Sequence, residues 1–169
     1  MNKLSLGQVI TSIVILLIQV LLLKNIEIVI FDTYVISILI YPLIIFLLPV
    51  GTRRSAIVLA AFFIGLFVDV FYDSIGVHAA AFVFTAFLRS FILKMLEPRL
   101  GYRSNDSITL STYGTNWFVL FIGIMLFTHI FFYFSIDAFS FVYFTKILVN
   151  SLISFFVSFL IALLYKLLL

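Results

Sequence analysis

The stretch GLFVDVFYDSIGVHAAA, residues 65–81, places two aspartates inside an otherwise apolar part of the chain. Asp69 and Asp73 lie four residues apart, which is about one helical turn. Gly76 and His78 follow, and the apolar pattern then resumes. A carboxylate inside a membrane is costly and needs a partner, whereas aspartate and glycine are common in turns. The stretch therefore predicts a helix that ends near Asp73, a tight turn, and a second helix that runs back.

The composition is that of an integral membrane protein. Of the 169 residues, 65% are hydrophobic and only 10% are charged, and the mean hydropathy is +1.34. A soluble domain carries about 25% charged residues, so this chain has too few to cover a water-facing surface. The absence of cysteine excludes disulfides and thiolate metal sites. The sequence offers no basic platform for nucleic acid. The apolar run up to Leu23 lacks a cleavage site, so we expect a retained first helix.

Six segments are candidates for membrane-spanning helices, which need about 20 mostly apolar residues. They are 6–23, 34–48, 56–72, 77–95, 115–134 and 140–168. Pro42 lies inside the second segment and would remove a backbone hydrogen bond, so a re-entrant segment is the alternative there. The longest connection, 97–114, is polar and predicts a solvated loop. The sequence thus predicts an all-α membrane protein with six transmembrane helices and a single domain, residues 1–169.

The basic residues predict an orientation. With six spans and an internal N-terminus, the connections and ends on one side hold Lys3, Arg53, Arg54, Lys94, Arg99, Arg103 and Lys166. The connections on the other side hold only Lys24. Lys and Arg concentrate in cytoplasmic loops, so we expect both termini and the 97–114 loop in the cytoplasm.

Asp69, His129 and Lys146 are expected at a similar depth in the outer half of the membrane. Ionisable groups at such positions are candidates for function and need a partner. An Asp69–Lys146 ion pair would neutralise two buried charges, so we predict this pair. It would either fix helix packing or belong to a polar layer with His129 and Asn150. The two carboxylates Asp69 and Asp73, without further acidic residues facing them, do not predict a metal site.

The last segment carries a polar stripe. Lys146, Asn150, Ser154 and Ser158 follow one another at four-residue steps. Small polar residues in this pattern let helices approach closely and hydrogen-bond across the contact. The stripe predicts either packing inside the bundle or a surface for a partner's membrane helix. Arg89 lies about two turns from the cytoplasmic end of its segment, where its side chain can extend toward lipid headgroups.

Signatures of enzymes are absent from the sequence. It contains no G-x-S-x-G elbow, no H-E-x-x-H and no phosphate-binding glycine loop. Two histidines without cysteine do not predict a catalytic metal centre. We therefore expect a non-catalytic protein without a cofactor.

The opening stretch also carries a family resemblance. Gly65, then Asp69, then a turn ending in Ile75–Gly76 and the small apolar helix AAAFVFTAFL at 79–88 resemble the pattern of the rod shape-determining protein MreD family. Supporting matches are Gln19, Pro49 followed by Arg53–Arg54, and Asn150 in the last segment. The resemblance covers most of the chain, and the order and spacing of these motifs carry it. Asp73, His78 and the long polar loop depart from the pattern.

The resemblance implies a fold similar to the substrate-binding S components of energy-coupling-factor transporters. It also implies the bacterial cytoplasmic membrane and a non-catalytic part in cell elongation. The implied partners are MreC and, directly or indirectly, the actin-like MreB and the RodA–penicillin-binding-protein 2 peptidoglycan synthase. The alternative is a transporter S component, in which Asp69, His129 and Lys146 line an outward-facing site for a vitamin-like molecule.

Overall fold

A computed structural model gives the arrangement of residues 6–26, 28–30, 34–103 and 106–168. In these parts the chain is mostly helical. The longer helices are α1 (Leu6–Leu21), α3 (Arg54–Tyr72), α4 (Val77–Met95), α6 (Thr115–Ala138) and α7 (Phe144–Leu168). The short elements are the 3₁₀ turns η1 (Leu23–Asn25) and η2 (Phe141–Tyr143), the strands β1 (Ile28–Ile30) and β2 (Tyr34–Ile36), and the one-turn helices α2 (Leu43–Phe46) and α5 (Leu110–Tyr113). Among the described helices, α3, α4, α6 and α7 are long and apolar enough to cross a membrane, so the chain is a multi-pass membrane protein.

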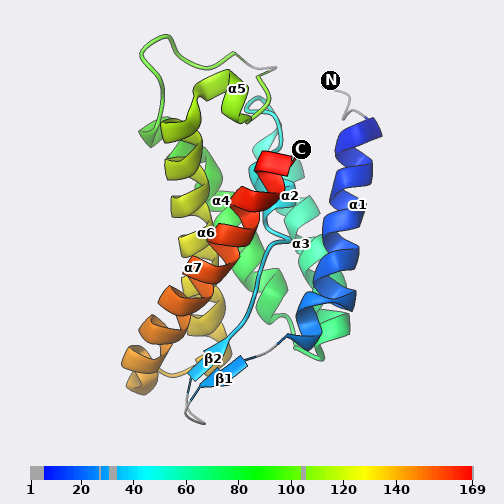
Figure 1. Cartoon of the computed structure of the whole chain (residues 1–169), viewed down its shortest axis with the longest axis vertical. Helices are drawn as coiled ribbons and strands as arrows, with labels where there is room; N and C mark the ends of the chain where they lie inside the picture. The colour runs from blue at the N-terminus through cyan, green and yellow to red at the C-terminus, as the bar shows by residue number, and fades with distance from the viewer. Residues whose placement is uncertain (1–5, 27, 31–33, 104–105, 169) are drawn as a thin grey trace.

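The chain runs back and forth along the long axis of the molecule (Figure 1). Helix α1 leads from one end to the β1–β2 hairpin at the other, and a largely extended segment returns from β2 toward α2. Helices α3 and α4 form one hairpin, and α6 and α7 form another. The start of α1, the α4–α6 connection and the end of α7 therefore lie at the same end of the molecule. That end carries the exposed side chains of Arg53, Lys94 and Arg99.

Segment 34–48 is not a helix, so the prediction of a second spanning helix was wrong. Strand β2 pairs with β1 in antiparallel register, with Val35 opposite Val29. Residues 37–40 have no regular structure, and Pro42 precedes the single turn of α2. The β-branched residues of this stretch favour an extended backbone, and Pro42 interrupts any helix that would include it. The segment is buried from 36 to 46, so its backbone needs hydrogen-bond partners elsewhere in the molecule.

The α3–α4 hairpin closes through two left-handed residues. Asp73, the C-cap of α3, has φ 52°, and Gly76, the N-cap of α4, has φ 78°. Glycine adopts this region freely and aspartate tolerates it, so these residues set the turn. Near the turn the helices touch through their backbones, because a Cβ built on Gly65 would lie 2.4 Å from the Cα of Ala79. Only glycine permits this approach. Helix α4 spans the residues expected from the sequence, and α3 begins two residues before the expected start.

The connection between α4 and α6 is anchored on the end of the bundle. The Tyr102 hydroxyl donates to the Leu93 carbonyl at 2.9 Å, and Trp117 Nε1 donates to the Leu96 carbonyl at 2.7 Å. The rings of Tyr113 and Trp117 are 4.4 Å apart. Burial raises the pKa of Tyr102 to about 12, so its hydroxyl stays protonated near neutral pH. Aromatic contacts therefore hold a connection that composition alone describes only as polar.

Candidate functional site

Polar side chains of α7 bind the backbone of the extended segment. Three donor–acceptor pairs join them: Val35 N to Asn150 Oδ1 (3.3 Å), Ser37 N to Ser154 Oγ (3.0 Å) and Leu39 N to Ser158 Oγ (3.0 Å). Four residues of a helix rise about 6 Å, and two residues of an extended chain advance about 6.6 Å. Acceptors at every fourth position of a helix therefore match alternate N–H groups of an extended neighbour.

This contact decides between the two interpretations of the α7 stripe. Asn150, Ser154 and Ser158 are buried, and each binds a residue of the same chain. Packing inside the bundle therefore describes these three side chains, which are not available to a partner's helix. The neighbour that they bind is an extended chain, whereas the four-residue pattern suggested a second helix.

Gln19 of α1 holds the extended segment from another side. Its Oε1 accepts the N–H groups of Ile40 at 2.9 Å and Tyr41 at 3.3 Å. Its Nε2 donates to the Ile38 carbonyl at 2.9 Å and to the Tyr72 hydroxyl at 2.6 Å. The amide of Gln19 is fully buried, and it provides the two acceptor contacts and one donor contact that a neighbouring strand would otherwise supply.

Asp69 caps the start of α4. Its carboxylate accepts the N–H groups of His78 at 2.9 Å and Ala79 at 3.0 Å, and the hydroxyl of Ser74 at 2.5 Å. The two amides belong to the first turn of α4, where no preceding turn of the helix can accept them. The carboxylate also lies at the positive end of the helix dipole. These contacts compensate its burial, with only 4% of Asp69 exposed, without a basic side chain.

The predicted Asp69–Lys146 ion pair was wrong. Lys146 is exposed and lines a pocket of about 210 Å³ near the start of α7, together with Asp137, Phe134 and Asn150. Asp69 takes its hydrogen bonds from the adjacent turn, so it has no need of a distant cation. The ion pair that is found among the described residues is a different one: it joins Lys24 to the exposed Asp73, with 3.6 Å between Nζ and Oδ2.

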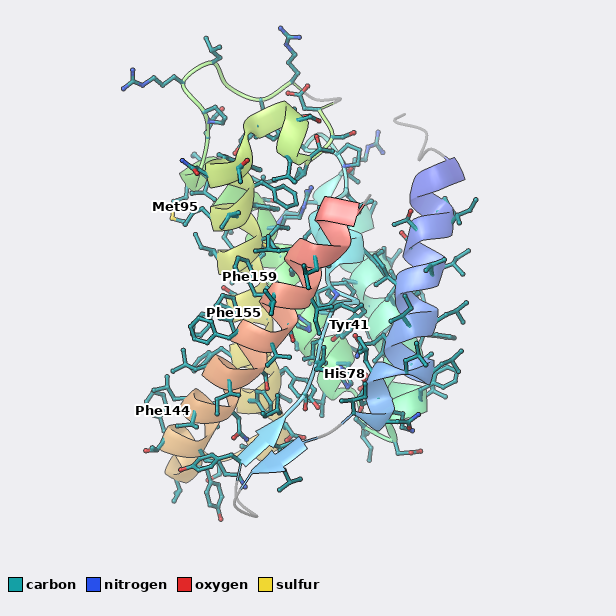
Figure 2. All side chains as sticks on the ribbon, in the orientation of Figure 1. Tyr41, His78, Met95, Phe144, Phe155 and Phe159 are labelled. Carbon is teal, nitrogen blue, oxygen red and sulfur yellow. The ribbon has the colours of Figure 1, made fainter. Side chains whose placement is uncertain are left out.

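His129 lies in a buried cluster with Tyr41, His78 and Thr85. The Tyr41 hydroxyl is 2.8 Å from His129 Nε2 and 3.1 Å from His78 Nδ1. The Thr85 hydroxyl donates to the Ala81 carbonyl at 2.7 Å and lies 3.2 Å from His129 Nδ1. Figure 2 shows Tyr41 and His78 close together in the interior of the bundle. The structure therefore brings His129 to a second histidine and a tyrosine, and not to Asp69 or Lys146.

The hydrogen bonds of this cluster have a direction. The single hydroxyl proton of Thr85 points to Ala81, so Thr85 accepts from His129 Nδ1–H. Nε2 of a neutral His129 then accepts the Tyr41 hydroxyl proton, and Tyr41 accepts from His78 Nδ1–H. This leaves His78 Nε2 as a buried acceptor, and it has no hydrogen-bond partner in the structure. The cluster is a chain of donors that runs from His78 to the α4 backbone.

Three members of this cluster were missed by the sequence analysis as site residues: Tyr41, His78 and Thr85. Tyr41 lies in the segment that was expected to be helical, and His78 lies beside the predicted turn, where no function was expected of it. A usable signal was the seven-residue spacing of His78 and Thr85, which places both on one face of a helix about two turns apart. Tyr41 had no comparable signal, because its neighbours depend on the path of the extended segment.

Arg89 is buried against the backbone that follows α2. The residue is 1% exposed. Its guanidinium donates to the carbonyl of Leu48, and to that of Pro49 at 3.4 Å, whereas its Nε has no hydrogen-bond partner in the structure. The guanidinium is therefore held by carbonyl groups that follow α2 and does not extend freely along the outside of the bundle, as the sequence suggested.

A metal centre has no support among the described residues, where no group of three His, Asp or Glu side chains is placed to hold a metal ion. Comparisons of the chain with protein-family models, curated proteins and solved structures found no match. The function therefore has to be inferred from the chemistry of the chain itself. In this chemistry most buried polar groups bind one another or the backbone of the extended segment.

Proposed function

We propose that the chain is a non-catalytic membrane scaffold of the bacterial cell-elongation machinery, related to the MreD family, that binds MreC. In this proposal it lies in the cytoplasmic membrane with both termini in the cytoplasm. It acts together with MreB and the RodA–penicillin-binding-protein 2 synthase, directly or through MreC. A scaffold needs a fixed shape and surfaces for its partners.

The observation that carries the proposal is the role of the residues on which the family resemblance rests. Gly65, Asp69 and Gly76 form the contact and the turn between α3 and α4. Gln19 and Asn150 bind the backbone of the extended segment. Each of these residues supports the position of a structural element, and none of them needs a substrate to explain its chemistry. Such residues are what a protein requires when its function is to hold a shape.

The outer surface of the bundle is suited to contact with lipid and with the membrane helices of partner proteins. Large apolar side chains are exposed along the helices, including Ile13, Phe63, Phe87, Phe91 and Phe156. Exposure of so many large apolar side chains to water is unfavourable, so we expect lipid tails or apolar faces of partner helices to cover them.

A transporter S component is the second candidate, and it is supported only by the pocket at the outer end of α7. Lys146, Asp137 and Asn150 line this pocket and could contact a charged small molecule. Its volume of about 210 Å³ is below the range of about 300–1,000 Å³ that is usual for drug-sized ligands. Asp69 and His129 do not belong to its lining. The pocket therefore supports transport less well than the rest of the molecule supports a scaffold.

The proposal is tested by capture of the tagged chain from native membranes in a mild detergent, with the copurified proteins identified by mass spectrometry. We expect MreC to exceed its amount in a capture with an unrelated multi-pass membrane protein. The Gly123→Ala variant should retain MreC, and a Gly65→Leu variant, in which α3 and α4 cannot pack, should lose it. Recovery of no elongation protein with the wild-type chain would refute the scaffold.

A thermal-shift screen with vitamins and metal ions tests the second candidate. A ligand that binds only the folded state raises its stability as the ratio of ligand concentration to Kd increases. A concentration-dependent rise that is lost in Lys146→Met would favour the S component. An unchanged melting temperature across the screen would exclude it for the compounds used.

A further inference from the structure

A second pocket lies at the end of α4 that faces the basic connections. Its volume is about 210 Å³. Side chains from the Val50–Thr52 connection, the last turns of α4 and the following loop surround it, and the residues are Val50, Thr52, Arg89, Ser90, Leu93, Lys94, Glu97 and Tyr102. Met95, the last residue of α4, is labelled in Figure 2 and marks this end of the molecule. Of the side chains described in the candidate site, this pocket contains Arg89, and it contains none of the polar residues of α7.

Arg89 gives this pocket a positive charge that the protein does not neutralise. Arg89 is 1% exposed, and the hydrogen-bond acceptors of its guanidinium are the carbonyl oxygens of Leu48 and Pro49. Carbonyl groups satisfy N–H donors, but they do not cancel a full charge. In the described part of the chain no carboxylate lies within ion-pair distance of Arg89, and its Nε–H has no acceptor. A buried charge in this state is strongly stabilised by an added anion.

The rim of the pocket adds further donors. Lys94 is exposed, forms no ion pair within the described residues, and lies five residues after Arg89 on the same helix. Ser90 contributes an exposed hydroxyl next to it. Glu97 is the acidic residue of the lining, so the side chains leave a net positive charge, with Arg89 at the inner wall and Lys94 at the opening.

We propose that this pocket binds a phosphate-bearing anion at the membrane surface, with Arg89 and Lys94 as its charged ligands and Ser90 as a hydroxyl donor. Arg89 is six residues from the end of α4, which corresponds to about 9 Å along the helix axis. Helix α4 has 19 residues, about 28 Å, which is close to the ~30 Å of a hydrocarbon core, so Lys94 lies near the boundary with the headgroups and Arg89 lies about 8 Å further in. The phosphate of an anionic phospholipid and a free phosphate share the chemistry that this site recognises.

The source of the phosphate is distinguished with the purified full-length chain in a neutral detergent. Three probes are added in separate titrations: phosphatidylglycerol, phosphatidylcholine and inorganic phosphate. Bound lipid is counted by native mass spectrometry, and binding of each probe is followed by the melting temperature. Binding of phosphatidylglycerol at least about tenfold tighter than phosphatidylcholine supports a lipid headgroup, and a response to inorganic phosphate supports a soluble anion.

Variants separate the pocket from a general basic surface. We expect Lys94→Gln to weaken binding of the preferred probe by about tenfold, as for the loss of one charge-assisted contact. Arg99→Gln removes the same charge from an exposed position outside the pocket lining and should change binding by less than about twofold. Glu97→Gln should tighten binding, because it removes the negative charge from the rim.

The proposal does not depend on Arg89 variants, which remove a buried side chain and could unfold the protein. Equal weakening by Lys94→Gln and Arg99→Gln would overturn it, because the surface charge alone would then explain binding. Failure of all three probes to bind the wild-type chain would also overturn it. Neither result bears on MreC capture, so the anion site and the scaffold can fail separately.

Discussion

The α3–α4 hairpin and the extended segment 34–48 meet one requirement in opposite ways. Both belong to the apolar body of a membrane protein, where every backbone polar group needs a hydrogen bond. The hairpin satisfies its backbone within its own helices, and it needs side-chain acceptors only at the turn, from Asp69. The extended segment has no such internal pattern and depends on side chains from α1 and α7.

The two regions also differ in the sequence separation between hydrogen-bond partners. Asp69 and the amides that it caps are 9 and 10 positions apart, whereas Asn150 and Val35 are 115 positions apart. The hairpin is therefore a local unit that can form early, and the extended segment becomes satisfied only when the first and last helices are in place. Four experiments, taken from the largest expected effect to the smallest, test this contrast.

Gly65→Ala is expected to have the largest effect. The added Cβ would lie 2.4 Å from the Cα and 2.9 Å from the N of Ala79, and backbone atoms cannot move aside as a side chain can. The free energy of unfolding should fall by about 3 kcal/mol, at the upper end of the usual range for overpacking. Denaturant titration in detergent measures it. Gly123→Ala is the matched control, because its Cβ would meet only the Phe159 ring at 3.7 Å; a similar loss in both variants would contradict the close approach.

Gln19→Met tests the opposite region. The change keeps the size of the side chain but removes both acceptor contacts to Ile40 and Tyr41 and the donor contact to Ile38. We expect a loss of about 2 kcal/mol, since each membrane hydrogen bond contributes about 0.6 kcal/mol and buried groups remain unpaired. Hydrogen exchange should accelerate at the Ile40 and Tyr41 amides while the α3–α4 amides stay protected. Uniform acceleration along the chain would show that the two regions are not independent.

Asp69→Asn tests the turn of the hairpin. The amide retains one acceptor oxygen but presents an NH₂ group to a backbone N–H, so the unfolding free energy should fall by about 1.5 kcal/mol. Asp73→Asn is the matched change at an exposed position, where the ion pair with Lys24 contributes less than about 1 kcal/mol. Lys146→Met in the Asp69→Asn background should be additive. A significant coupling energy between these two substitutions would show that Asp69 and Lys146 interact, which would contradict the hydrogen bonds described for Asp69.

Ser154→Ala and Ser158→Ala should have the smallest effects, about 1 kcal/mol each, because each leaves one buried N–H unpaired. Ser151→Ala provides a control on the same helix. Ser151 is fully buried, but its hydroxyl has no hydrogen-bond partner in the structure, so its removal should change stability by less than about 0.5 kcal/mol. If Ser151→Ala is as damaging as Ser154→Ala, volume explains the losses and the backbone contacts do not.

The parts of the fold that were predictable from the sequence are those with local causes. Length, apolar periodicity and turn residues define α3, α4 and the turn at Gly76. Segment 34–48 was assigned to a helix because its composition is equally apolar, and apolar content does not distinguish a helix from a buried extended chain. Its conformation depends on acceptors that lie in distant parts of the sequence, Gln19 and Ser154 among them.

The candidate site was predictable in its residue types but not in its pairings. Burial of Asp69, His129 and Asn150 agrees with their positions in apolar segments. A charge in the membrane suggests an opposite charge as its partner, which is why the sequence predicts a cation for Asp69. The unpaired amides at the start of the adjacent helix are equally good partners, and no sequence pattern ranks them against a cation. Tyr41 could not be connected to His129 without the path of the extended segment.

The contact between α7 and the extended segment also fixes the position of α7 along that segment. If α7 slid by one four-residue step, alternate N–H groups would meet the next position of the helix. In one direction that position is Ala162, which has no polar side chain, and in the other it is Lys146, which has donors only. Either slip leaves one N–H group of the segment without an acceptor, that of Leu39 in the first case and that of Val35 in the second. The stripe has acceptors at the three positions that this register uses and at neither neighbouring position, so the sequence itself permits a single alignment of the last helix along the segment.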